Sequence, residues 1–193
     1  MNPLIPAFAV LSAAGGAPPP ASDITGAVSP LLPSLCRPLD AGSGDGGVLR
    51  CAGLVGTDVF LRGPDEAREV ALARPDGFLA PPPGGAHLGR SVTWRLLGDR
   101  PVAAVLRYRF PEGGADILLV LKPAGEGKAG CPVGAVEDAG GPSGSGAERA
   151  AALADRRAPL FRCGRDRPVL DGPFSPPLQA RAEAWLGEET PAR

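Results

Sequence analysis

Hydrophobic and polar residues alternate most regularly between residues 90 and 122. Three runs with a period of two, at residues 91–97, 102–110 and 116–122, are separated by the turn sequences Gly-Asp-Arg and Pro-Glu-Gly-Gly. A period of two places successive side chains on opposite faces of a strand. The pattern therefore predicts a three-stranded antiparallel meander with one buried face, and residues 131–136 are a candidate fourth strand.

Shorter apolar runs at residues 48–51 and 58–61 predict two further strands. Residues 65–74 are ambiguous, because the acidic residues at their start and the arginine at their end suit a helix. The turn sequence Arg-Pro-Asp-Gly at residues 74–77 instead favours a strand over residues 69–73 that enters this turn. We adopt the strand interpretation and keep the helix as the alternative.

Two segments have the composition of helices. Residues 147–158 are rich in alanine and arginine, place Ala150, Leu153 and Ala154 on one side, and are followed by a proline. Residues 177–186 begin with proline and are followed by glycine, as is typical of helix ends. The elements together predict an α+β fold: a mainly antiparallel sheet, the first helix packed on it, and a C-terminal helix.

The first residues have the pattern of an export signal. Residues 4–14 form an apolar run of 11 residues, which is shorter than the roughly 20 residues of a membrane-spanning helix. Such a run fits the hydrophobic region of a signal peptide. We expect residues 1–21 to be a signal peptide, cleaved near residue 14 or residue 21, and we expect no transmembrane segment after it.

Three regions are expected behind the signal peptide. Residues 22–35 continue a stretch rich in proline, alanine and serine without periodicity, which predicts a flexible leader. Residues 36–187 contain the predicted strands and helices, and their length is usual for a single domain. Residues 188–193 are expected to be a tail.

Four cysteines, Cys36, Cys51, Cys131 and Cys163, contain no C-x-x-C pair. An even number of cysteines behind an export segment predicts disulfides formed in an oxidising compartment. Three pairings are possible, and loop closure favours near partners, so we predict Cys36–Cys51 and Cys131–Cys163. The wide spacing and the single histidine of the chain do not fit a zinc site, and we expect no metal and no cofactor.

The balance of charges narrows the range of partners. The formal net charge is −1 and the isoelectric point is near 5.9, so no overall field attracts nucleic acid or an anionic membrane.

The chain has 28 glycines, so a bare G-x-G-x-x-G pattern does little to distinguish a nucleotide-binding protein from any other glycine-rich chain. The two matches, at residues 42–47 and 125–130, lead into predicted strands, whereas a dinucleotide phosphate needs a helix N-terminus.

Candidate catalytic residues are few. The only histidine, His87, lies in a glycine-rich segment, and the chain has no G-x-S-x-G or S-x-x-K sequence, so we interpret it as a loop histidine. The carboxylates Asp58, Asp65, Glu66 and Asp116 could serve a hydrolase, because acid–base chemistry by carboxylates needs no diagnostic motif.

Aromatic and basic residues have structural interpretations. The sequence Arg-Tyr-Arg-Phe at residues 107–110 interleaves cations and rings, as in proteins that stack nucleotides. On an alternating strand, however, the arginines share a solvated face and the rings share the core face. Trp94 and Trp185 are predicted core residues, and the arginines within residues 162–167 are interpreted as ordinary surface rather than as an anion site.

Several stretches of the chain resemble a group of small, uncharacterised exported (periplasmic) proteins of high-GC proteobacteria. They are residues 46–53 (GGVLRCAG), 87–96 (HLGRSVTWRL), 130–136 (GCPVGAV) and parts of 153–168 (LAD, FRCG and DRP). The resemblance covers about residues 36–168 and departs from the group between Asp138 and Glu148, where this chain is rich in glycine, proline and serine. It implies export and two disulfides, and it brings no activity with it.

We therefore expect a periplasmic or secreted binding or interaction module without catalysis, whose partner could be a periplasmic or envelope protein. One alternative is a hydrolase that uses the carboxylates named above. The other is a structural or assembly accessory of the cell envelope. Convergence of two carboxylates in one pocket would distinguish the hydrolase from the binding module.

Overall fold

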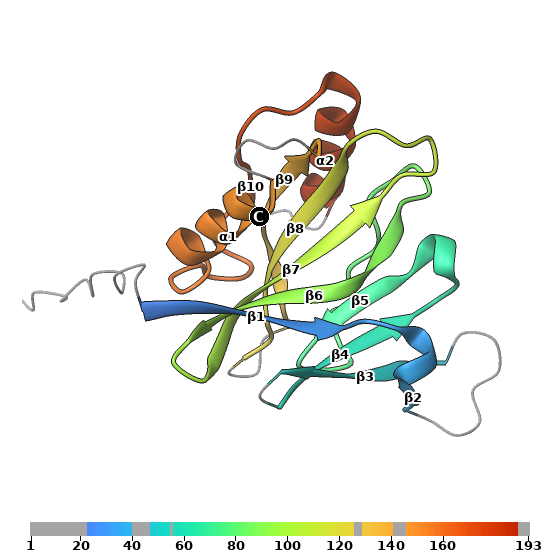
Figure 1. The fold of residues 1–193 in the computed structure, drawn as a ribbon, viewed down its shortest axis with the longest axis vertical. Coiled ribbons are helices and arrows are strands. Elements are labelled where there is room, and N and C mark those ends of the chain that lie inside the picture. The colour runs from blue at the N-terminus through green and yellow to red at the C-terminus, as the bar shows by residue number, and fades with distance from the viewer. Residues whose placement is uncertain (1–22, 40–46, 55, 126–128, 141–145, 189–193) are drawn as a thin grey trace, which may run out of the picture.

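The computed structural model has ten strands and two α-helices in the part of the chain that it describes, residues 23–39, 47–54, 56–125, 129–140 and 146–188 (Figure 1). Most neighbouring strands run antiparallel, and a helix lies near the C-terminal end. The fold is α+β, as the sequence predicts. The signal-peptide prediction for residues 1–21 and the tail prediction beyond residue 188 lie outside the described residues.

The predicted meander forms the centre of a six-stranded sheet with the order β1-β6-β7-β8-β9-β10. Neighbouring strands are antiparallel except β10, which is parallel to β9. The candidate fourth strand is confirmed, because it belongs to β9 and pairs with β8. The strands are β1 (Ile24–Pro30), β6 (His87–Leu97), β7 (Arg100–Arg109), β8 (Asp116–Lys122), β9 (Cys131–Asp138) and β10 (Val169–Leu170).

A second, antiparallel sheet has the order β2-β3-β4-β5. Its strands are β2 (Arg37–Pro38), β3 (Leu49–Leu54), β4 (Thr57–Arg62) and β5 (Glu69–Leu72). The strand interpretation of residues 69–73 is confirmed by β5. A short 3-10 turn, η3 (Asp65–Ala67), precedes it in place of the alternative helix.

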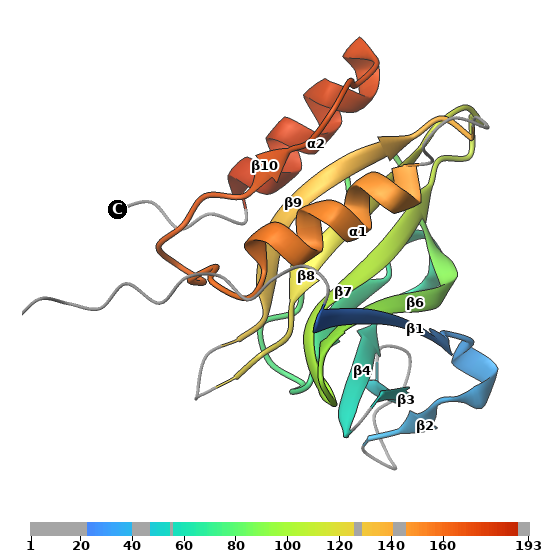
Figure 2. The ribbon, with the colours of Figure 1, turned by 60° about the vertical axis from the view of Figure 1, so that its left-hand side comes forward.

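The large sheet is covered on both faces (Figure 2), so the prediction that the meander has one buried face is wrong. On one face lies α1 (Gly146–Arg157), whose predicted apolar side, Ala150, Leu153 and Ala154, is buried against β7, β8 and β9. On the opposite face, the second sheet and α2 (Pro176–Glu188) share one core with the large sheet. Both predicted helices are confirmed, each within two residues of its predicted ends.

The prediction of a flexible leader at residues 22–35 is wrong. Residues 24–30 form β1, which pairs with β6 along its whole length, and η2 (Pro33–Leu35) follows as a 3-10 turn. Only Ile24 and Ser29 of β1 are buried, so the strand has no apolar period in its sequence. Its backbone hydrogen bonds to β6 hold it in place, and such bonds leave no pattern in the side chains.

Both disulfides have the predicted pairing. Cys36 is bonded to Cys51, which joins the segment after η2 to β3. Cys131 is bonded to Cys163, which joins the start of β9 to the segment after α1. All four cysteines are therefore used in these two bonds.

The two tryptophans lie in the core, as predicted. Trp94 is fully buried, and its indole N–H donates a hydrogen bond of 2.8 Å to the Ser29 hydroxyl on β1. Trp185 packs edge-to-face on Tyr108 at 5.6 Å between ring centroids, and its indole N–H donates to the Ala80 carbonyl at 2.9 Å. Trp94 therefore links the edge strand to the core, and Trp185 fastens α2 to it.

Replacing the buried indole should destabilise the domain strongly. We expect Trp94→Ala to lower the free energy of unfolding by roughly 3–5 kcal/mol, because a large buried side chain is lost and a cavity remains. Val28→Ala, on the exposed part of β1, is the control and should change it by no more than about 0.5 kcal/mol. Chemical denaturation measures both values, and a loss under about 1 kcal/mol for Trp94→Ala would contradict the core position of this residue.

Candidate functional site

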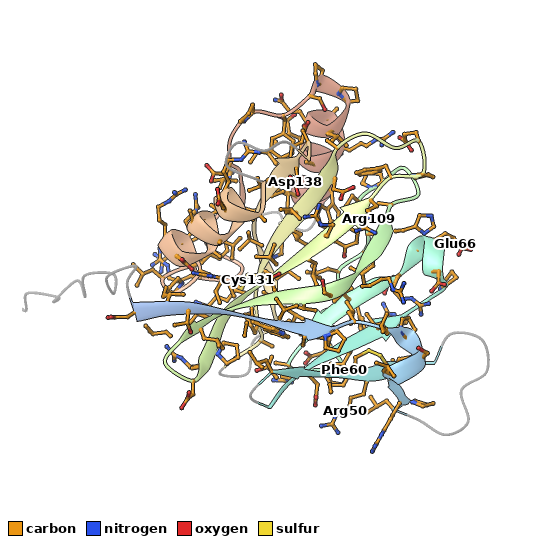
Figure 3. The ribbon with its side chains drawn as sticks, in the orientation of Figure 1. Arg50, Phe60, Glu66, Arg109, Cys131 and Asp138 are labelled. Carbon is orange, nitrogen blue, oxygen red and sulfur yellow. A yellow bond between two sulfur atoms is a disulfide. The ribbon has the colours of Figure 1, made fainter. Side chains whose placement is uncertain are left out.

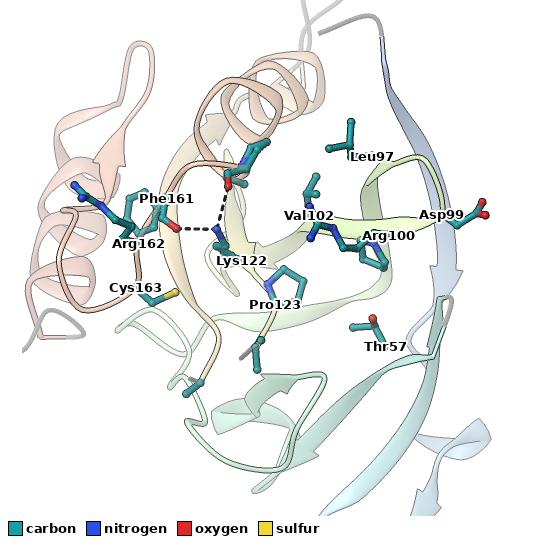
Figure 4. A pocket seen from close by; sticks show the side chains of 16 residues that line it. Thr57, Leu97, Asp99, Arg100, Val102, Lys122, Pro123, Phe161, Arg162 and Cys163 are labelled. Carbon is teal, nitrogen blue, oxygen red and sulfur yellow. Dashed lines mark hydrogen bonds between the residues drawn. The ribbon is translucent and has the colours of Figure 1, made fainter. Parts of the chain in front are cut away.

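One hollow in the described part of the structure is a cavity of about 820 Å³ at one end of the large sheet (Figure 4). The turn between β6 and β7, the end of β8 and the segment after α1 form its walls. A volume of this order is usual for a small-molecule site. Side chains from all three walls face it, among them Leu97, Arg100, Val102, Lys122, Phe161 and Cys163.

A tight turn forms the first wall. Gly98 has a φ of +59°, a left-handed conformation that glycine adopts without strain, so β6 reverses directly into β7. The reversal places Asp99 and Arg100 at the cavity. Val102, two residues after Arg100 on the same strand, is an apolar part of the wall. Arg100 is exposed, whereas Val102 is buried.

The segment after α1 forms the opposite wall and is fastened twice. The Lys122 ammonium donates hydrogen bonds to the carbonyl oxygens of Phe161, at 2.7 Å, and Pro159, at 3.3 Å (Figure 4). Cys131 lies opposite Lys122 in the register of β8 and β9, and its disulfide to Cys163 holds the same segment. The wall is therefore fixed by a covalent bond and by a charge-assisted contact.

A second hollow, of about 390 Å³, brings together the residue types of a Ser-His-Asp triad: Ser34, Asp65 and His87. A triad needs its histidine hydrogen-bonded to the carboxylate. The Asp65 carboxylate instead binds Arg68, and no hydrogen bond in the described part of the chain joins His87 to either partner. The arrangement therefore has the composition of a triad without its geometry.

The four carboxylates named for a hydrolase do not converge. Asp58 lies on β4 beside Arg50, Asp65 and Glu66 belong to η3, and Asp116 lies on β8 beside Arg107. Of these four, only Asp65 lines one of the two hollows described above. Figure 3 shows Glu66 at the second sheet, far from the end of β9 where Asp138 lies. The convergence that would favour hydrolysis is absent among these four residues.

Asp116 does approach one carboxylate that sequence reasoning did not select. Arg107 donates to Asp116 and to Asp138, with 2.7 Å between nitrogen and oxygen in both contacts. Burial alone would raise the pKa of Asp138, but hydrogen bonds from Arg107 and from the backbone N–H groups of Gly140 and Gly146 lower it below 3.8. An acid of this kind is ionised at neutral pH and cannot act as a general acid.

Asp138 and its neighbour Glu137 instead hold the helices. Asp138 accepts a hydrogen bond from the Gly146 N–H at the start of α1. Glu137 accepts from the N–H of Ser175 at 2.6 Å and from its hydroxyl at 3.1 Å, directly before α2. A Cβ on Gly146 would lie 2.5 Å from that of Asp138, so glycine is required there. These buried acids are structural.

Most of the other motifs lie as interpreted from the sequence, but His87 is the first residue of β6 and not a loop residue. Gly47 precedes β3 and Gly130 precedes β9, so both glycine patterns lead into strands, while residues 42–46 and 126–128 lie outside the described residues. Tyr108 on β7 and Phe110 directly after it are buried in the core, and Arg109 is exposed. Arg107 departs from the interpretation as a solvated residue, because it is half-buried and pairs with Asp116 and Asp138. In the described residues, no group of three His, Cys, Asp or Glu side chains is placed to hold a metal ion.

The comparisons with known proteins do not assign the chain to a family. No protein-family model, curated protein or solved structure matches the chain. The helices of the described residues include none that is long and apolar enough to cross a membrane.

The Asp138 network should make stability depend on pH in the acid range. The pKa of Asp138 is lowered in the folded protein, so its contribution is present above the unfolded pKa and is lost as pH falls through the folded pKa. We expect the free energy of unfolding to fall below about pH 4, and to fall less steeply in Asp138→Asn. Denaturant titrations between neutral pH and about pH 2 measure this slope.

The control for this prediction is Glu183→Gln, which removes a carboxylate from α2 that accepts a hydrogen bond from Gln179 at the surface. Its acid-range slope should match that of the unsubstituted protein. An unchanged slope in Asp138→Asn would contradict the role assigned to the Asp138 carboxylate.

Proposed function

We propose that this chain is an exported, non-catalytic binding module whose ligand enters the cavity between the β6–β7 turn and the segment after α1. The observation that carries the proposal is the cavity itself, which has the volume of a small-molecule site and a wall fastened by Lys122 and by a disulfide. A wall fixed before the ligand arrives loses little conformational entropy on binding.

The residues around the cavity favour binding over catalysis. Asp99 is the one carboxylate among the described lining residues, and the lining contains no histidine. General acid–base catalysis by carboxylates needs two such groups, or one with a second acid or base nearby. The hydrolase alternative therefore gains no support at this cavity.

Two disulfides support the export part of the proposal. Disulfides form and persist in oxidising compartments, such as the periplasm and the extracellular space. The apolar run at residues 4–14 supplies the matching signal. Both observations support a periplasmic or secreted location.

Cell fractionation tests the location. We expect the full-length chain with a C-terminal tag, expressed in a Gram-negative host, to yield a periplasmic product that begins near residue 15 or residue 22. A variant lacking residues 2–21 should stay in the cytoplasm, because the export signal is removed. An intact cytosolic product that begins at Met1 would contradict export.

Thermal stabilisation by added compounds, measured with and without a substitution that blocks the cavity, tests the binding site. We expect at least one member of a panel of small organic acids, bases and neutral compounds to raise the melting temperature of the purified protein. A ligand at 100 times its dissociation constant adds about 2.7 kcal/mol, and each kcal/mol raises the melting temperature by roughly 2–4 °C. Ala124→Trp places a large ring at the half-buried lining position of Ala124 and should abolish the response.

Ala147→Trp is the matched control, because Ala147 is an exposed residue of α1 that does not line the cavity. It should keep the full response. An equal response in Ala124→Trp would place the ligand elsewhere, and a panel without any response would contradict the proposed binding function.

A further inference from the structure

We infer that the cavity takes an organic anion, with its acidic group on Arg100 and its apolar body against Phe161 and Val102. This inference rests on the proposed function and adds the chemical class of the ligand. It also changes the interpretation of the basic residues after Cys163, which the sequence alone favours as ordinary surface.

The charges of the lining are the first observation. Three cations, Arg100, Lys122 and Arg162, line the cavity, and Asp99 is the one anion among the described lining residues. Cationic walls around a hollow concentrate anions there, because the low dielectric of the protein focuses the field into the opening.

The three cations are not equivalent. Arg162 donates two hydrogen bonds from one edge of its guanidinium to Asp166, the shorter of 2.9 Å from Nη2, and this pair raises the pKa of Arg162. Lys122 is occupied in fastening the wall. Arg100 is exposed and forms no ion pair with any described residue. Its guanidinium is therefore the group available to a ligand.

Further arginines extend this basic field beyond the cavity. Arg157 lies over the ring of Phe161, 5.7 Å from its centroid, and donates a hydrogen bond to the Arg167 carbonyl. Arg165 is close enough to contribute to the lowered pKa of Asp166. Neither arginine lines the cavity. Arg157 ends α1 and Arg165 follows Cys163, so both flank the segment that forms the wall opposite Arg100, and their charge favours a negatively charged ligand there.

The apolar part of the lining is the second observation. Phe161 and Val102 are buried side chains that nevertheless line the cavity, and Leu97 and Pro123 add partly exposed apolar surface beside them. Inorganic phosphate or sulfate would leave the exposed apolar surface of Leu97 and Pro123 in water. A ligand with an alkyl or aryl body would cover it, at a gain proportional to the apolar area removed from water.

Octanoate, octan-1-ol and octylamine are suitable probes, because they share one alkyl chain and differ in charge. We expect isothermal titration calorimetry to give at least tenfold tighter binding of octanoate than of the alcohol or the amine. The octanoate affinity should fall as sodium chloride is raised, since salt screens an exposed ion pair. Inorganic phosphate should not compete, because it lacks the apolar body.

Two arginine variants test the assignment of the acidic group. Arg100→Ala should weaken octanoate binding at least tenfold and leave octan-1-ol binding unchanged, since only the charge-assisted hydrogen bond is lost. Arg109→Ala removes an exposed arginine at the other end of the same strand and should leave both affinities unchanged. Arg100 is an exposed residue beside a turn, so its variant should fold with an unchanged melting temperature.

Each contrary outcome overturns this inference in a distinguishable way. Equal binding of octanoate and octan-1-ol, abolished by Ala124→Trp, would refute the anion preference and leave the binding function intact. Equal weakening by Arg100→Ala and Arg109→Ala would show a general charge effect and refute the role of Arg100. Absence of binding by all three probes would also refute the inference, while the wider compound panel decides the binding function separately.

Discussion

Two adjacent carboxylates at the end of β9 hold a helix on each face of the large sheet. Neighbouring residues of a strand point to opposite faces, so Glu137 reaches the segment before α2 and Asp138 reaches the start of α1. Arg107 on β7 reaches across β8 and pairs with Asp138, and its positive charge compensates the buried carboxylate. The position of both helices depends on this pair, because each carboxylate satisfies N–H groups that a helix or its preceding turn leaves without partners.

An irregular pairing near the start of β9 changes which of its residues face α1. The register between β8 and β9 shifts at Val120 and Leu121, so Val133 and Val136, three residues apart, both pack in the core under α1. Regular alternation would place them on opposite faces. The other end of β9 begins at Cys131, whose disulfide fixes the cavity wall. One strand thus positions the helices at one end and the candidate site at the other.

The sequence predicts those parts of the structure in which a local pattern determines the fold. The meander, β5 and both helices have clear periods or turn signals, and the cysteine spacing favours the observed pairing. The edge strand β1 has no such period, because its backbone rather than its side chains attaches it to β6. The cavity was missed because Arg100, Lys122 and Phe161 come from a turn, a strand end and a loop that meet only in three dimensions. In the sequence, only the basic residues near Cys163 pointed to this site.

The edge strand β1 also limits how the large sheet can grow. The Leu31 N–H donates to the Arg90 carbonyl on β6, so by alternation the backbone groups of Pro30 and Val28 face outward. Pro30 has no N–H to offer an added strand. Arg95 reaches across Gly26, where a Cβ would lie 2.8 Å from its Nη1 atom, and donates to the Ile24 carbonyl. Both ends of this edge are therefore closed to pairing, which protects the sheet against edge-to-edge aggregation.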